Sequence, residues 1–219
     1  MNRRTFLQSS ALSGGGLLLS FTFLSSFKEK ANASTQELNG FVKITSDNLI
    51  QIMSPNPEGG QGVKTSMPMI VAEELDVDWK QVQVIQADLD TKHFTRQFIG
   101  GSQAIHQGWK PLRQAGATAR QLLREAAAKQ WQVPVNEVTT DKGVLYHKAS
   151  GKSASYGSMA TAASQIPVPT QVELKKISDF QIIGKSKQNV DIRKIVTGQP
   201  LFGIDTQVKG MLYAMIVHP

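Results

Sequence analysis

The sequence predicts an α+β fold, with layers of the α/β type, in which helices pack on a mixed sheet. Two observations support this prediction. Apolar and polar side chains alternate over 41–45 and 49–53, and 82–86 also reads as a strand. In 63–75 and 109–130, by contrast, apolar residues recur at helical spacing. Strands and helices are therefore expected to share one core.

The elements follow in a simple order. Ser46 and Asp47 can turn the chain between the first two strands, which gives a β-hairpin. The first helix opens near Val63, although Pro68 limits where it can begin. After the long second helix we expect a second hairpin at 138–147, and then a short helix at 156–165.

Beyond Gly184 the texture of the sequence changes. Short apolar pieces alternate with turn residues, and we expect these pieces to be strands: 190–192, 195–198, 202–205 and 211–217. The last piece is followed only by His218 and Pro219, so the sequence looks cut off at that point.

Composition restricts the function. The chain has 219 residues and a net charge of +7, but its lysines and arginines are scattered, which argues against nucleic-acid binding. With no cysteine it can hold no disulfide, thiolate zinc site or cysteine-bound iron–sulfur cluster. Its four histidines lack metal-ligand spacing, so we expect neither a metal site nor a catalytic residue of this chain's own.

The N-terminus has the layout of an export signal. Arg3 and Arg4 precede a mildly apolar stretch over 11–27, and Ala31-Asn32-Ala33 forms a small-x-small cleavage site. Paired arginines are typical of the twin-arginine route, which exports folded proteins to the periplasm or the outer face of the cytoplasmic membrane. We assign 1–33 to this signal. The alternative is an uncleaved anchor, for which the stretch is short and rich in glycine and serine.

Two glycine loops are candidates for ligand binding. Gly60, Gln61 and Gly62 stand at a strand-to-helix junction, where free N–H groups suit a phosphate, while Gln61 can both donate and accept. Gly100-Gly101-Ser102 opens the long helix in the same way, with Ser102 as a hydroxyl cap. Taken locally, the first loop is equally well a glycine turn with an exposed glutamine.

These loops also carry a family resemblance. Glu58-x-Gly60-Gln61-Gly62-x-x-Thr65, Ala72-Glu73-Glu74-Leu75, Gly100-Gly101-Ser102 and the run from Leu112-Arg113 to Ala119-Arg120 resemble the molybdenum hydroxylases, most nearly the isoquinoline 1-oxidoreductase large subunits. The segment from Asp191 through Gly198 and Asp205 to Ala214 resembles the entry to that family's α/β hammerhead domain. The resemblance covers nearly all of the chain after the signal.

The resemblance implies a cofactor and partners. In this family a molybdopterin, in bacteria commonly the cytosine dinucleotide, holds the molybdenum through its own sulfurs. Gly60, Gln61, Gly62, Gly100, Gly101 and Ser102 would line that cofactor. The enzyme would add water-derived oxygen to N-heterocycles or aldehydes and pass electrons to a small iron–sulfur subunit, with a cytochrome c acceptor and membrane association in some relatives.

The resemblance also sets domains and a limit. It implies a portion of the molybdopterin-binding domain over 34–185 and the truncated start of the hammerhead domain over 186–219. The family's catalytic glutamate lies in a Gly-x-Gly-Glu segment that this sequence lacks, and Glu58 does not match it. Two alternatives stay open: an exported, non-enzymatic binding protein with the same fold, and an unrelated anion-binding α/β domain.

Overall fold

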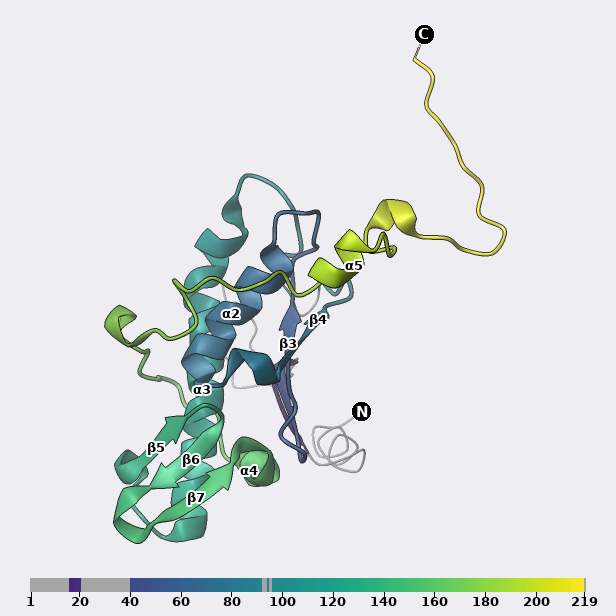
Figure 1. The fold of residues 1–219 in the computed structure, drawn as a ribbon. Helices are drawn as coiled ribbons and strands as arrows, with labels where there is room; N and C mark the ends of the chain where they lie inside the picture. The colour runs from purple at the N-terminus through teal and green to yellow at the C-terminus, as the bar shows by residue number, and fades with distance from the viewer. Residues whose placement is uncertain (1–15, 21–39, 92–93, 95, 219) are drawn as a thin grey trace, which may run out of the picture.

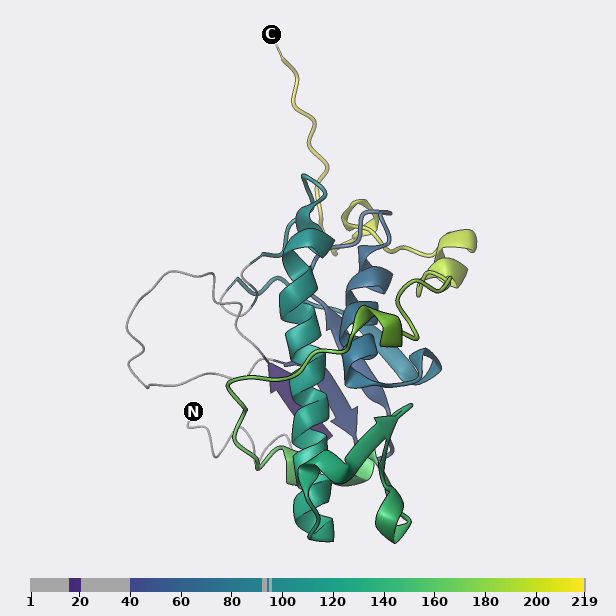
Figure 2. The ribbon, with the colours of Figure 1, turned by 90° about the vertical axis from the view of Figure 1, so that its left-hand side faces the viewer.

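The structure is a computed structural model that describes residues 16–20, 40–91, 94 and 96–218 (Figures 1 and 2). Most of the expected export signal, residues 1–15 and 21–33, lies outside the described residues. Within the described ranges, no helix has the length and apolar character needed to cross a membrane.

The larger sheet has four strands in the order β1-β2-β3-β4. They are β1 (Gly16–Ser20), β2 (Gly40–Thr45), β3 (Ile50–Ser54) and β4 (Val82–Gln86). β2 pairs antiparallel with both β1 and β3, whereas β3 and β4 are parallel. The predicted mixed sheet and its first hairpin are confirmed. β1 was not predicted, and it falls within the segment assigned to the signal.

Helices α2 (Val63–Leu75) and α3 (Gln103–Trp131) lie side by side on one face of this sheet (Figures 1 and 2). Both were predicted from their apolar spacing. They can approach closely because Gly116 has no side chain: a Cβ there would lie 2.3 Å from the Val71 carbonyl oxygen. The buried side chains between these helices and the sheet form the core, which includes Ile44, Ile52 and Leu122.

A small second sheet packs at the far end of α3. It consists of β5 (Val138–Asp141), β6 (Val144–His147) and β7 (Lys152–Ser155), and α4 (Tyr156–Ala163) follows directly. The predicted hairpin and short helix are confirmed, while β7 was missed. Tyr156 is fully buried and donates its hydroxyl to the Leu75 carbonyl oxygen at 2.8 Å, and burial raises its pKa.

Residues 173–191, which we call the strap, run back over α3 and α2 (Figure 2). Buried carboxylates of α2 hold the strap. Glu73, 1% exposed, accepts from the backbone N–H groups of Gln181 (3.0 Å), Ile182 (2.6 Å) and Ile183 (2.9 Å). Glu74 accepts from the Lys175 backbone N–H at 2.9 Å. The strap is therefore anchored through its backbone rather than by an element of its own.

The strands predicted beyond Gly184 are wrong. Helix α5 (Ile192–Val196) and a 3-10 turn at Gly203–Asp205 occupy two of those places, and 211–217 is extended without a strand partner among the described residues. The turn of α5 closes its own backbone bonds, such as Ile195 N–H to Asp191 O at 3.0 Å. A strand needs a neighbouring backbone, and the described part of the chain offers none here.

Candidate functional site

The two glycine loops meet at one end of the larger sheet. They follow the carboxyl ends of the parallel strands β3 and β4, and both lie at the upper end of the molecule in Figure 1. The Asn56 side chain donates to the Phe98 carbonyl oxygen at 3.0 Å, and a Cβ on Gly59 would lie 3.1 Å from Ile99. The carboxyl ends of parallel strands are where ligands bind in open α/β sheets.

A carboxylate fills the first loop. Gly60 and Gly62 have φ angles of 100° and 78°, which glycine adopts without strain. They wrap around Glu58, whose carboxylate accepts from the N–H groups of Gly60 (2.7 Å), Gly62 (2.9 Å) and Lys64 (2.9 Å). The expectation of free N–H groups at the start of α2 is therefore wrong, because Glu58 already binds them.

The Gln61 amide also bonds within its own loop. Its oxygen accepts from the Gly59 N–H at 2.6 Å, and its nitrogen donates to the Pro57 carbonyl oxygen at 3.1 Å. Gln61 thus uses both its donor and its acceptor, as the sequence analysis expected, but on backbone. Its contact with a cofactor stays a prediction.

The second loop is shaped by an aromatic ring. A Cβ on Gly100 would lie 2.5 Å from the Phe98 ring, so only glycine fits there, and the Arg96 guanidinium stacks 5.0 Å from the centre of that ring. Ser102 has φ 52° and makes no side-chain capping bond, so the predicted hydroxyl cap is wrong. Left-handed backbone at Ser102 replaces the extended backbone usual for a capping serine.

Two glutamines tie both loops to the sheet. The Gln97 amide nitrogen donates to the carbonyl oxygens of Pro55 (3.0 Å) and Asp88 (2.7 Å). The Gln86 amide nitrogen donates to those of Ser54 and Asn56, both at 3.0 Å. Gln86 Oε1 and Ser54 Oγ are buried and have no partner among the described residues. Ser54 and Gln86 are register partners on β3 and β4, so both unpaired atoms lie at the strand ends next to the loops.

A cavity of about 300 Å³ lies against the first loop. Its walls come from the loop and strand ends on one side, and from the strap end and the segment after it on the other. The lining includes Pro57, Glu58, Gly60, Lys64, Gln86, Gln97, Asn189, Asp191, Ile195 and Phe202. The charged groups among these are two carboxylates and one ammonium, Glu58, Asp191 and Lys64. The cavity therefore favours a neutral, polar ligand group over a phosphate.

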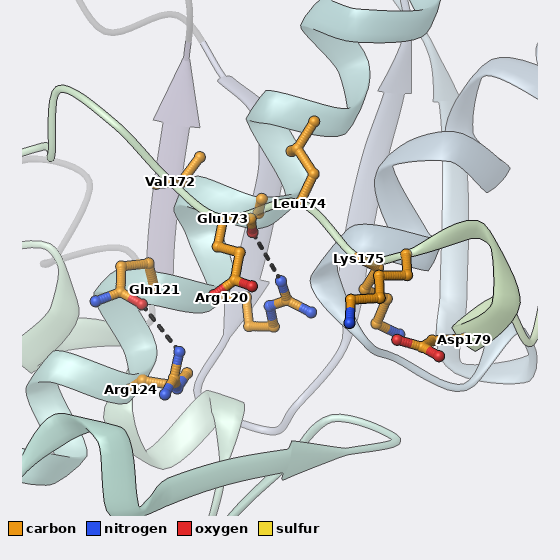
Figure 3. Close-up of a pocket in the computed structure, with 10 residues that line it drawn as sticks. Arg120, Gln121, Arg124, Val172, Glu173, Leu174, Lys175 and Asp179 are labelled. Carbon is orange, nitrogen blue, oxygen red and sulfur yellow. Dashed lines mark hydrogen bonds between the residues drawn. The ribbon is translucent and has the colours of Figure 1, made fainter.

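A smaller polar pocket of about 150 Å³ marks the crossing of the strap over α3 (Figure 3). Arg120 donates to the Glu173 carbonyl oxygen at 3.2 Å. Arg124 donates to the Gln121 side chain at 3.1 Å and to the carbonyl oxygens of Val135 and Val138. Burial, and then the charge of Arg120, lower the pKa of Arg124. These contacts hold the strap to α3, and we assign the pocket a structural role.

Sequence reasoning missed most of the residues that shape the site. The capping role of Glu58 was open to prediction, because an acidic residue just before a helix is a common capping signal. The scaffold formed by Gln86 and Gln97 had no sequence signal. The same is true of Asp191, which is 127 residues from Lys64, its ion-pair partner at 2.5 Å. Thr95, noted beside the second loop, lies outside the described residues.

Comparison with known proteins explains the pairing of the loops. The family described as the molybdopterin cofactor-binding domain matches residues 8–194, which include both loops and almost the whole strap. This chain belongs to that family. The molybdopterin-binding family thus accounts for the two blocks of glycines and for the buried glutamates that hold the strap as parts of one domain.

Three curated relatives are similar to this chain. The beta subunit of isoquinoline 1-oxidoreductase from Brevundimonas diminuta is 34% identical over 217 residues, which covers 81% of this chain and 28% of the relative. One of the subunits of nicotinate dehydrogenase from Pseudomonas putida is 28% identical and covers 84% and 15%. A membrane-bound aldehyde dehydrogenase (pyrroloquinoline-quinone) of Gluconacetobacter polyoxogenes is 27% identical and covers 97% and 29%. This chain therefore spans less than a third of the length of each relative.

Proposed function

We propose that this chain is the N-terminal part of the molybdenum-cofactor-binding large subunit of an oxidoreductase. The complete enzyme would hydroxylate N-heterocycles or oxidise aldehydes with oxygen derived from water. The observation that carries the proposal is the meeting of two glycine loops at the carboxyl ends of β3 and β4, in a chain of the molybdopterin-binding family. The names of the relatives support the two substrate classes.

The residues present fit the uncharged part of such a cofactor. A pterin ring carries N–H donors, and the unpaired acceptors Gln86 Oε1 and Ser54 Oγ lie beside the cavity. Gly60, Gln61 and Gly62 would form the near wall. When bound, the molybdenum centre would supply the redox chemistry, while this chain would orient the cofactor and keep water from it.

The phosphate part fits better at the second loop. At the start of α2 the N–H groups are filled by Glu58, whereas the start of the 29-residue helix α3 has no side-chain cap. Helix N-termini attract anions through their N–H groups and the helix dipole. Gly100, Gly101 and Ser102 would therefore receive the phosphate, and the cytosine dinucleotide form is our proposal for the rest of the cofactor.

Partners and location follow from the same proposal. A small subunit with iron–sulfur clusters would take the electrons, since this chain has no cysteine to hold a cluster. A cytochrome c can act as the final acceptor. Arg3 and Arg4 support export by the twin-arginine route to the periplasm or the outer face of the cytoplasmic membrane, which cell fractionation tests.

Metal and nucleotide analysis of the purified protein tests the function. We expect about one molybdenum per chain, and cytidine monophosphate on hydrolysis of the cofactor. Gln61→Ala should lower the molybdenum content, whereas Gln130→Ala, at an exposed position near the other end of α3, should not. Protein without molybdenum would favour the non-enzymatic binding protein. Phosphate binding that is unchanged in Gln61→Ala, also without molybdenum, would favour a plain anion-binding domain.

A further inference from the structure

The end of the strap is attached to α2 by an ion pair beside the cavity. Lys64 lies in the first turn of α2, and its Nζ is 2.5 Å from Asp191 Oδ2. The two side chains are only 15% and 9% exposed, so water screens their attraction less than it screens a surface pair. Lys194 also approaches Asp191, at 3.6 Å, but its side chain is 53% exposed.

A neighbouring hydrogen bond supports the same attachment. The Thr65 hydroxyl accepts from the Val190 N–H at 3.0 Å, so consecutive residues of α2 hold consecutive residues of the strap. Asp191 immediately precedes α5, where aspartate commonly caps the helix, yet its side chain makes no capping bond. Its carboxylate instead binds Lys64, which indicates that the tertiary contact prevails over the local one.

We propose that Lys64 and Asp191 are positioning residues whose ion pair fixes the far wall of the cavity and so sets how firmly the cofactor is held. Both line the cavity, together with Asn189 and Ile195 on either side of Asp191. The identity of the ligand rests on the proposed function, whereas the contact itself does not. Lys64 also links the two walls, because its own N–H is bound by Glu58.

The fold does not depend on this pair. Glu73 holds the strap separately, through three backbone N–H groups at 181–183. Loss of the ion pair should therefore release the strap end and the segment after it, while the rest stays in place. Variants at these two positions are expected to fold.

A double-mutant cycle on the full chain tests the contact. Hydrogen exchange of the Val190 amide is measured in Lys64→Met, in Asp191→Asn and in the double variant. Each single variant should exchange about tenfold faster, and the double variant no faster than either single one, because the pair is already lost. Exchange at Ile182, which Glu73 holds, should stay unchanged. Lys185→Met is the matched control, since Lys185 is exposed on the same strap and forms no ion pair with a described residue.

A second measurement distinguishes positioning from plain structural support. The molybdenum retained by the loaded protein after dilution and gel filtration should fall about tenfold faster in both single variants, and Lys64→Arg should keep the wild-type rate. Additive exchange rates in the cycle, or unchanged molybdenum retention, would overturn the proposal. Wild-type protein that never carries molybdenum would instead refute the proposed function, and the exchange cycle would still decide whether the pair holds the wall.

Discussion

At the scale of single residues, the glycine loop owes its shape to the carboxylate of Glu58. Three N–H groups converge on it, and Gly60 and Gly62 supply the left-handed backbone that this convergence needs. The glycines were predictable from the sequence because few residues other than glycine adopt such backbone readily. That they close on a carboxylate of the chain, rather than on a ligand, depends on how the loop folds back.

Replacing Glu58 with Ala should loosen the loop. The three N–H groups would lose their acceptor, and we expect a loss of about 1–2 kcal/mol in unfolding free energy. Amide exchange at Gly60, Gly62 and Lys64 should rise together. Glu58→Gln keeps one acceptor oxygen and should fall between the two. Equal exchange in wild type and Glu58→Ala would show that the hydrogen bonds do not hold the loop.

At the scale of elements, the approach of α2 and α3 depends on one glycine. Gly116 lies opposite the backbone of α2, and a Cβ there would meet the Val71 carbonyl oxygen at 2.3 Å and the Glu74 Cβ at 2.9 Å. Gly108 lies on the same helix, but its nearest neighbours are the flexible ends of Leu112 and Met67, at 3.1 and 3.2 Å. Backbone cannot move aside, whereas these side chains can.

The two glycines should therefore respond in opposite ways to the same change. Gly116→Ala is expected to force the helices apart and lower the unfolding free energy by about 1–3 kcal/mol. Gly108→Ala should be neutral or gain up to about 1 kcal/mol from helix propensity. Chemical denaturation of both variants gives the comparison. A neutral Gly116→Ala would mean that the helices cross less closely than the structure indicates.

The strap is an element that the sequence did not reveal. Apolar periodicity identifies α2, α3, β2, β3 and β4 because each buries one face of regular structure. The strap has no such face. It is held because buried carboxylates such as Glu73 need donors, and its backbone N–H groups supply them. In the sequence, Glu73 and Glu74 stood out only as part of a family motif.

At the scale of the whole molecule, the signal segment and the fold meet at β1. Gly16–Ser20 pairs with β2 at the edge of the larger sheet. Cleavage after Ala33 would remove β1 and leave β2 as the edge strand, although Val42 and Ile44 of β2 are fully buried. An exposed edge strand is a site for pairing with another chain.

Export should depend on the paired arginines. Changing both Arg3 and Arg4 to Lys keeps the charge but removes the twin-arginine motif, so we expect the protein to accumulate in the cytoplasm. Fractionation and immunoblotting measure its location. Changing Lys28 and Lys30 to Arg, outside the motif, should leave the location unchanged. Periplasmic protein in the double Lys variant would contradict this route.

The C-terminal segment marks where local reasoning fails. Ile204, Leu212 and Ile216 are 94%, 91% and 83% exposed, so nothing in the described structure covers them. Their apolar character suggested strands, but strand formation depends on a partner backbone that the local sequence does not specify. The hammerhead assignment for 186–219 therefore stays a prediction.

The sequence by itself determined the regular elements of the α+β core and the positions of the glycine loops, because periodicity and backbone conformation are local properties. It also carried the family motifs. Only the tertiary structure decided which groups meet: Glu58 with the N–H groups of its own loop, Glu73 with the strap, and Lys64 with Asp191 across 127 residues. Buried polar groups are paired by whatever the fold brings within hydrogen-bond distance, and spacing along the chain does not encode that.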